Sequence, residues 1–134
     1  MATSQQRGLG IEVDSLTGLH WVGILLAALT GVIHLFLGVS GVTGTYISTE
    51  LGVAFLLAGL GFFSAVVLVL LDVRRRAVYA AGIPYTAIQL ILWYYLNFAT
   101  GQRSFPGDVG IMGAIDKIVQ VALILVLIAL LRGE

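Results

Sequence analysis

The sequence predicts an all-α fold: an integral membrane four-helix bundle with antiparallel up-down topology and both termini cytoplasmic. Hydrophobic residues make up 59% of the 134 residues and charged residues only 10%, whereas a soluble domain carries about 25% charged residues. Four stretches contain almost no charge, and each reaches the roughly 20 residues that cross a bilayer as a helix. They occupy residues 19–39, 51–71, 77–98 and 112–131. We therefore expect a polar N-terminal tail at 1–18 and a single transmembrane domain at 19–132.

The composition excludes several classes of function. Seven basic side chains balance seven acidic ones, so no net charge attracts nucleic acid. The chain has no cysteine, which excludes disulfides, thiolate metal sites and cysteine nucleophiles. The sequence contains no catalytic, nucleotide-binding or metal-binding motif. It therefore predicts a protein that is not an enzyme and holds no cofactor.

The first two predicted helices have recognisable starts. Asp14, Ser15 and Thr17 precede the first helix and are candidate N-caps. The first apolar stretch is too long, and its basic flank too weak, for a signal peptide, so we expect it to be retained as a helix. Ser48 or Thr49 is expected to cap the second helix.

The connections between the later helices also carry information. Residues 72–76 form so short a turn that the second and third helices must be antiparallel neighbours. Pro84 falls within the first two turns of the third helix, where it kinks the helix or marks a later start. Asp108, in the longest polar connection, is a candidate cap for the fourth helix.

Basic residues near the ends of the spans are unevenly distributed, and this predicts the orientation. One side holds Arg7, Arg74, Arg75, Arg76 and Arg132, and the other holds Arg103 and Lys117. Because basic residues are enriched on the cytoplasmic side, we expect a multi-pass protein of the cytoplasmic membrane with both termini inside. Arg74, Arg75 and Arg76 are then the topology anchor, with lipid headgroup contact as a secondary role.

One face of the first helix carries small residues. At about 100° per residue, Gly23, Ala27, Gly31 and Gly38 fall on one narrow face together with His34. Ladders of small residues let two helices approach closely in lipid, where dispersion drives association. This face packs against another helix of the same chain or against a second copy, and the sequence leaves both possibilities open.

The fourth helix places charge inside the membrane. Between Lys117 and Arg132 it extends only about 21 Å, less than the hydrocarbon thickness of about 30 Å. Asp116 and Lys117 are therefore expected to lie below the outer interface, with Asp116 pointing inward. Adjacent residues diverge by about 100°, so Lys117 is expected to be a poor partner for Asp116.

We expect an intramembrane polar cluster in the outer half of the bundle, formed by His34, Asn97, Asp116 and Gln120. Three roles fit such a cluster: hydrogen bonds that fix helix packing, a proton- or ion-responsive site, or a ligand site. Gln89 on the third helix is a separate polar point that we expect to join helices by hydrogen bonding.

The function that these patterns favour is a non-enzymatic structural or accessory role. The expected partners are membrane lipid and either further copies of the chain, as a homo-oligomer, or a larger membrane protein complex. The alternative is a small transporter or channel that uses the outer-half polar cluster. A third class is a heme- or redox-linked subunit. His20 and His34 are about 21 Å apart along one helix, so they could share a heme only across a dimer.

Several segments resemble an uncharacterised family of small four-helix membrane proteins from halophilic archaea. The segments that carry the resemblance are Leu16–Trp21, Gly31–Val39, Leu51–Phe62, Leu71–Arg76, Gly82–Ala87 and Ile115–Lys117. The resemblance covers most of the chain after residue 8. It implies the cytoplasmic membrane of a high-salt organism, and it implies no activity, cofactor or ligand.

Overall fold

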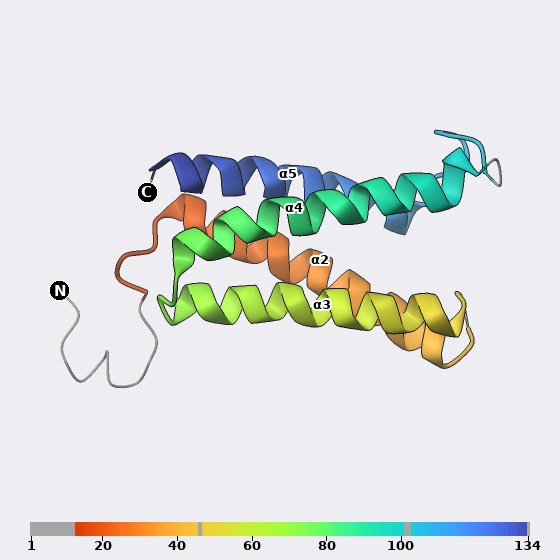
Figure 1. Ribbon diagram of the computed structural model, residues 1–134, viewed down its shortest axis with the longest axis horizontal. Helices are drawn as coiled ribbons and strands as arrows, with labels where there is room; N and C mark the ends of the chain where they lie inside the picture. Colours follow the sequence, from red (N-terminus) through yellow and green to blue (C-terminus); the bar gives the residue numbers. More distant parts are fainter. Residues whose placement is uncertain (1–12, 46, 101–102, 134) are drawn as a thin grey trace.

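The computed structural model describes residues 13–45, 47–100 and 103–133, and within these ranges the chain is helical throughout its regular structure (Figure 1). Its elements are α2 (Gly18–Val42), α3 (Thr49–Leu70), α4 (Arg75–Tyr94), the π-helical η1 (Tyr95–Ala99) and α5 (Ile111–Gly133). The prediction of an all-α chain with four long helices is confirmed. Of the predicted tail, residues 1–12 lie outside the described ranges.

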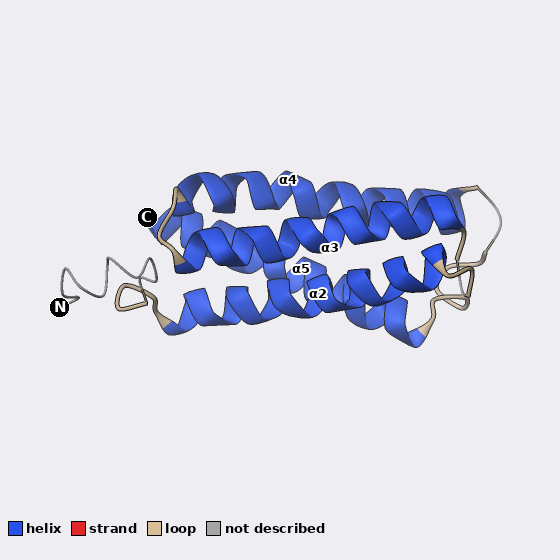
Figure 2. Ribbon diagram, turned by 90° about the horizontal axis from the view of Figure 1, so that it is seen from below, coloured by secondary structure: helices blue, strands red, loops and turns tan. Residues whose placement is uncertain are grey.

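The four helices run alternately up and down (Figures 1 and 2). The start of α2, the α3–α4 turn and the end of α5 lie at one end, which we call the arginine end because it holds Arg74, Arg75 and Arg76. The α2–α3 and α4–α5 connections lie at the other, the loop end. Interhelical contact is most extensive between α2 and α3, and slightest between α3 and α4. Consecutive α3 and α4 are therefore antiparallel, but they are loosely packed neighbours.

Within the described residues, α2, α3 and α5 are long and apolar enough to cross a membrane. The third predicted span, residues 77–98, does not reach this standard, because Gln89, Pro84 and the tyrosines of α4 lower its mean hydropathy. Its length is not the reason. The helical path continues from α4 into η1 without a break, from Arg75 to Ala99.

Local hydrogen bonds explain where the first two helices begin. Thr17 is the cap of α2: its backbone N–H donates to the Nδ1 atom of His20 at 3.1 Å, and its hydroxyl accepts from the backbone N–H of His20. The two residues thus form a capping box in which histidine takes the place usually held by glutamate. Ser48 caps α3 by accepting from the N–H of Leu51.

The structure decides two points about the later helices. Of the two alternatives for Pro84, the later start is excluded, because Pro84 lies inside α4, which begins at Arg75. Asp108 does not cap α5, which begins at Ile111. Its carboxylate instead accepts the backbone N–H of Ser104 at 2.8 Å and stabilises the preceding loop.

Glycines allow the close crossing of α2 and α3 near the loop end. A Cβ added to Gly52 would lie 2.7 Å from the Cα of Gly41 and 2.9 Å from the carbonyl oxygen of Gly38. These neighbours are backbone atoms, which cannot move aside as the end of a side chain can. The helix α2 continues through this crossing to Val42, beyond the predicted end at residue 39.

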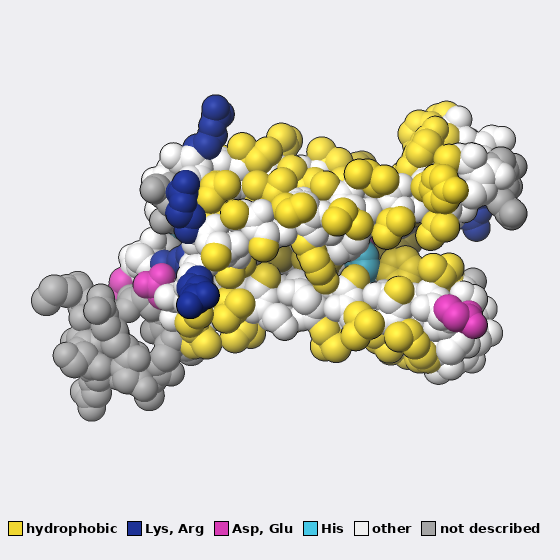
Figure 3. Space-filling view, in the orientation of Figure 1, with side chains coloured by type: hydrophobic (Ala, Val, Ile, Leu, Met, Phe, Trp, Pro, Cys, Tyr) yellow, Lys and Arg dark blue, Asp and Glu magenta, His cyan; other side chains and the backbone are white. Residues whose placement is uncertain are grey.

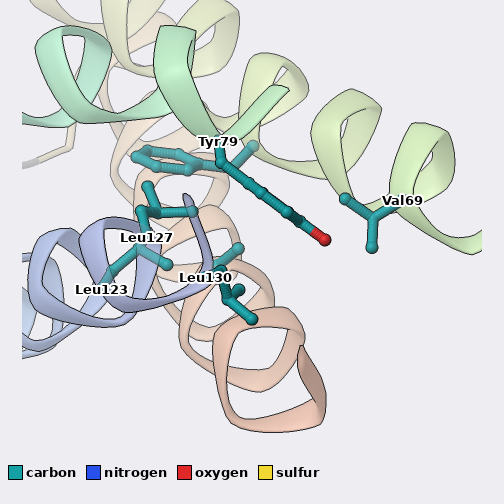
Figure 4. Close-up of a cluster of buried hydrophobic side chains, with 7 residues drawn as sticks. Val69, Tyr79, Leu123, Leu127 and Leu130 are labelled. Carbon is teal, nitrogen blue, oxygen red and sulfur yellow. The ribbon is translucent and has the colours of Figure 1, made fainter. Parts of the chain in front are cut away.

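The apolar core fills the half of the bundle nearer the arginine end. Its buried members come from all four α-helices: Ala27, Phe62, Val69, Tyr79, Leu123, Leu127 and Leu130. Figure 4 shows Tyr79 reaching from α4 between Val69 of α3 and the leucines of α5. The aromatic ring thereby occupies space that the slight α3–α4 contact leaves open.

The glycine crossing leads to a test with one added methyl group. We expect Gly52→Ala to lower the free energy of unfolding by about 1–3 kcal/mol, because overpacking against backbone forces the helices apart. Gly18→Ala is the matched control, since an added Cβ there meets nothing within 4 Å. The measurement is SDS-induced unfolding of the purified protein in mild detergent. Equal stability of the two variants would contradict the close crossing.

Candidate functional site

Six polar side chains from three helices meet in the interior, in the half of the bundle nearer the loop end. We call them the polar network: Thr30 and His34 from α2, Gln89 from α4, and Asp116, Lys117 and Gln120 from α5. Thr30 and Gln120 are fully buried, and His34 and Asp116 are 2% exposed. Such groups leave water at a cost in free energy that only close partners can offset.

Asp116 is the centre of the network. The hydroxyl of Thr30 donates to its Oδ1 atom at 2.5 Å, and the ammonium of Lys117 lies 2.9 Å from its Oδ2 atom. The Nδ1 atom of His34 lies 3.7 Å from Oδ1. The expectation that Lys117 is a poor partner for Asp116 is therefore corrected: the long lysine side chain turns back to the carboxylate of its neighbour.

His34 is fixed in one orientation by the backbone of its own helix. Its Nδ1 atom lies 2.8 Å from the carbonyl oxygen of Thr30, and because a carbonyl can only accept, Nδ1 carries the hydrogen. The rings of Phe55 and Phe62 on α3 pack at 5.0 and 5.6 Å from the imidazole centre. The helix that contributes no polar member thus closes the network with aromatic rings.

The glutamines complete the network through α4. Lys117 donates to Oε1 of Gln120 at 2.9 Å, and Nε2 of Gln120 donates to Oε1 of Gln89 at 3.0 Å. The interactions therefore run as a chain from His34 and Thr30, through Asp116 and Lys117, to Gln120 and Gln89. Such chains of hydrogen bonds fix both the rotation and the register of the helices that supply them.

The structure places the predicted cluster residues in two locations. It brings His34, Asp116 and Gln120 together, and it leaves Asn97 apart. Asn97 belongs to η1, and its amide donates to the carbonyl oxygen of Trp93 in the preceding turn at 2.8 Å. It satisfies a backbone group where the helix widens.

Sequence reasoning left three network members out of the cluster. Thr30 is four residues before His34 and therefore on the same helical face, a signal available from spacing alone. Gln89 was expected to join helices, which it does, although as part of this network. Lys117 also lies over the ring of Trp93, at 5.5 Å from its centre. This cation–π interaction with Trp93 favours the conformation in which the Lys117 side chain points into the bundle.

The comparison with protein families matches residues 9–131 to a family of unknown function, DUF7475. The match covers most of the chain. The chain belongs to this family. No curated protein and no solved structure matches it. An uncharacterised family is what the resemblance in the sequence predicted, and the network and helix contacts described here locate the polar interior of one DUF7475 member.

The small-residue face of α2 is buried inside this DUF7475 chain. An added Cβ on Gly23 would meet Val126 of α5, on Gly31 the ring of Phe63, and on Gly38 the side chain and backbone of Leu56. Ala27 lies in the apolar core. Of the two possibilities left open by the sequence, the described contacts place this face against other helices of the same chain.

The three arginines of the α3–α4 turn differ in environment. Arg75 is buried: its guanidinium donates to the carbonyl oxygen of Val69 at 2.8 Å and to the hydroxyl of Ser15 at 2.6 Å. Arg76 is exposed and donates to the carbonyl oxygen of Leu131 near the end of α5. Arg74 is exposed, with a left-handed backbone (φ 48°) that begins α4. Arg75 and Arg76 therefore tie together the arginine end, besides any role at a membrane surface.

The ionisable groups of the network do not amount to a metal centre. Across the described residues, no three His, Asp or Glu side chains gather as metal ligands do. What the arrangement offers chemically is a carboxylate in contact with both an ammonium and an imidazole. Such a group holds helices together in the interior.

Removing the central carboxylate tests the network. We expect Asp116→Ala to lower the free energy of unfolding by about 3–5 kcal/mol, because it leaves the Lys117 ammonium without its buried counter-charge. Glu50→Ala, at an exposed position in the first turn of α3, is the control and should cost under about 1 kcal/mol. SDS titration in mild detergent measures both. A loss for Asp116→Ala no greater than that for Glu50→Ala would contradict the network.

Proposed function

We propose that this chain is a non-enzymatic, multi-pass protein of the cytoplasmic membrane that serves as a structural or accessory subunit. The observation that carries the proposal is the inversion of polarity between surface and interior. Large aliphatic side chains are exposed along every helix; examples are Leu25 (66%), Leu57 (64%), Ile91 (66%) and Ile118 (70%). Figure 3 shows hydrophobic side chains over much of the visible bundle, with Lys and Arg gathered mainly at one end.

A lipid environment explains this surface. Soluble monomers rarely expose contiguous apolar patches larger than a few hundred Å², whereas lipid covers such a surface without cost. The arginine end then faces the cytoplasm, in keeping with the enrichment of basic residues on that side. The resemblance of the sequence supports a halophilic archaeon as the source of this membrane.

The internal pairing of the polar network favours a structural role over conduction. Its members hydrogen-bond chiefly to one another, so they pin α2, α4 and α5 together. Between the network and the arginine end lies the apolar core, with Leu123, Leu127 and Leu130 in succession along α5. A conducting path needs polar groups or water along its whole length, and this core interrupts such a path within one copy.

Partners would use the outward faces of the helices. The small-residue face of α2 is occupied by α3 and α5, so a homo-oligomer or a larger complex would contact the exposed aliphatic side chains. On α4 and η1 these include Ile88, Ile91 and Leu96. Association through such faces relies on dispersion and on exclusion of lipid.

Native mass spectrometry of protein extracted gently from its own membranes tests the accessory role. We expect assemblies heavier than the 14.2 kDa chain, either as whole multiples of that mass or with the added mass of a host protein. Whole multiples support the homo-oligomer, and added protein mass supports the accessory subunit. A chain recovered only as a monomer would contradict the proposal.

A transporter that uses the polar network is the second candidate, favoured by the buried Asp116, Lys117 and His34. Ionisable groups at membrane depth often mark proton or ion pathways. We expect vesicles containing the protein to dissipate a pH or Na⁺ gradient no faster than protein-free vesicles. Faster dissipation that Asp116→Asn abolishes, and Gly18→Ala leaves unchanged, would overturn this expectation and favour the transporter.

A further inference from the structure

A cavity of about 60 Å³ lies beside the apolar core, on the side of the polar network nearer the arginine end. All four α-helices contribute to its lining, which is almost wholly apolar. It is partly open, and it lies between α3 and α4, which make slighter contact than the other neighbouring α-helices of the bundle. None of the network side chains lines it, so it is a separate feature of the interior.

The spacing of α3 and α4 explains why the cavity exists. Two hydrogen bonds join the helices: Arg75 to the carbonyl oxygen of Val69 near the turn, and Tyr85 to that of Ala58 farther along, each at 2.8 Å. Between these two bridges the lining includes three small residues, Gly61, Ala65 and Gly82, among larger ones such as Phe62 and Val66. The small residues leave room for the partly open cavity.

One polar atom in the cavity wall lacks a partner. Thr86 is fully buried, and its Oγ1 atom makes no hydrogen bond with the described residues. The same side chain lines the cavity. Burying a hydroxyl without a partner destabilises a protein, and this hydroxyl contrasts with the network, where buried groups are paired. It is therefore the position at which a bound molecule would gain a hydrogen bond.

Depth along the helix restricts the chemistry of that molecule. Thr86 is eleven residues beyond Arg75, or about 16 Å along the axis. In the proposed membrane setting this lies below the ester or ether oxygens of phospholipids, which stay near the headgroups. The apolar lining also disfavours a charged ligand. What remains is a neutral molecule with a hydrocarbon body and an oxygen that can accept from Thr86.

We propose that the cavity between α3 and α4 binds a neutral lipophilic alcohol or carbonyl compound, whose oxygen accepts a hydrogen bond from the Thr86 hydroxyl. The molecule enters sideways between the helices, and its hydrocarbon body contacts Gly61, Ala65 and Leu127. Tyr85 also lines the cavity, and the bond from its hydroxyl to the carbonyl oxygen of Ala58 joins α4 to α3. This site does not depend on the role of the polar network or on the oligomeric state.

Matched probes separate the hydrogen bond from the hydrophobic contact. Geraniol is an acyclic isoprenoid alcohol, and myrcene is an acyclic hydrocarbon of similar size without the oxygen. We expect the detergent-solubilised protein to bind geraniol about fivefold more tightly than myrcene, the effect of one typical hydrogen bond. Binding is measured as the shift in unfolding temperature with probe concentration. If neither geraniol nor myrcene shifted the unfolding temperature, the proposal would be overturned.

Variants locate the binding in this cavity. Thr86→Val keeps the shape of the side chain and removes a hydroxyl that makes no bond with the described residues, so it should fold and should bind both probes equally. Thr43→Val, an exposed position whose hydroxyl bonds Val39, is the matched control and should keep the preference for geraniol. Ala65→Phe should fill the cavity and abolish both shifts. Undiminished preference for geraniol in Thr86→Val would overturn the assignment of Thr86 even if Ala65→Phe failed to fold.

Discussion

The pairing of Asp116 is the constraint on which the arrangement of this bundle depends. A carboxylate that is 2% exposed must find partners, because an isolated buried charge costs more than the packing of one helix provides. Its two oxygens are bound from different helices, by Thr30 of α2 and by Lys117 of α5 itself. This fixes the rotation of α5 against α2. The bond from Gln120 to Gln89 then brings α4 into the same register.

Two kinds of interaction hold the helices together: the polar network and the close approach of backbones at glycines. The contact between α3 and α4 has neither. Hydrogen bonds join α2, α4 and α5, whereas α3 meets α2 through glycines that let the backbones approach. Between α3 and α4 there is no glycine crossing and no network member of α3. The bridges from Arg75 and Tyr85 hold these helices at a distance instead. The cavity lies along the contact between α3 and α4 because neither the polar network nor a glycine crossing brings these two helices close together.

Much of the fold, and part of the site, could be predicted from the sequence. Runs of apolar residues gave the four helices, and helical spacing placed His34, Asp116 and Gln120 on inward faces. Spacing treats each side chain as a fixed direction, however, and so it placed Lys117 away from Asp116. A long flexible side chain such as lysine can bend far enough to reach the side chain of the adjacent residue, although the two leave the helix in directions about 100° apart. Asn97 could not be placed, because the change to π-helix at Tyr95 rotates every later residue.

The same reasoning shows why Arg75 and Thr86 escaped prediction. Three consecutive arginines at a turn suggest a common role at a surface, yet the left-handed residues Asp72 and Arg74 direct Arg75 alone into the bundle. Thr86 has no sequence signal, because its significance is that nothing in the described structure bonds it. A bundle that pairs a carboxylate, an ammonium and an imidazole leaves the Thr86 hydroxyl beside its cavity without a hydrogen bond from the described residues. That contrast favours an occupant from outside the chain over a defect in packing, since valine would fill the same space without burying a polar atom.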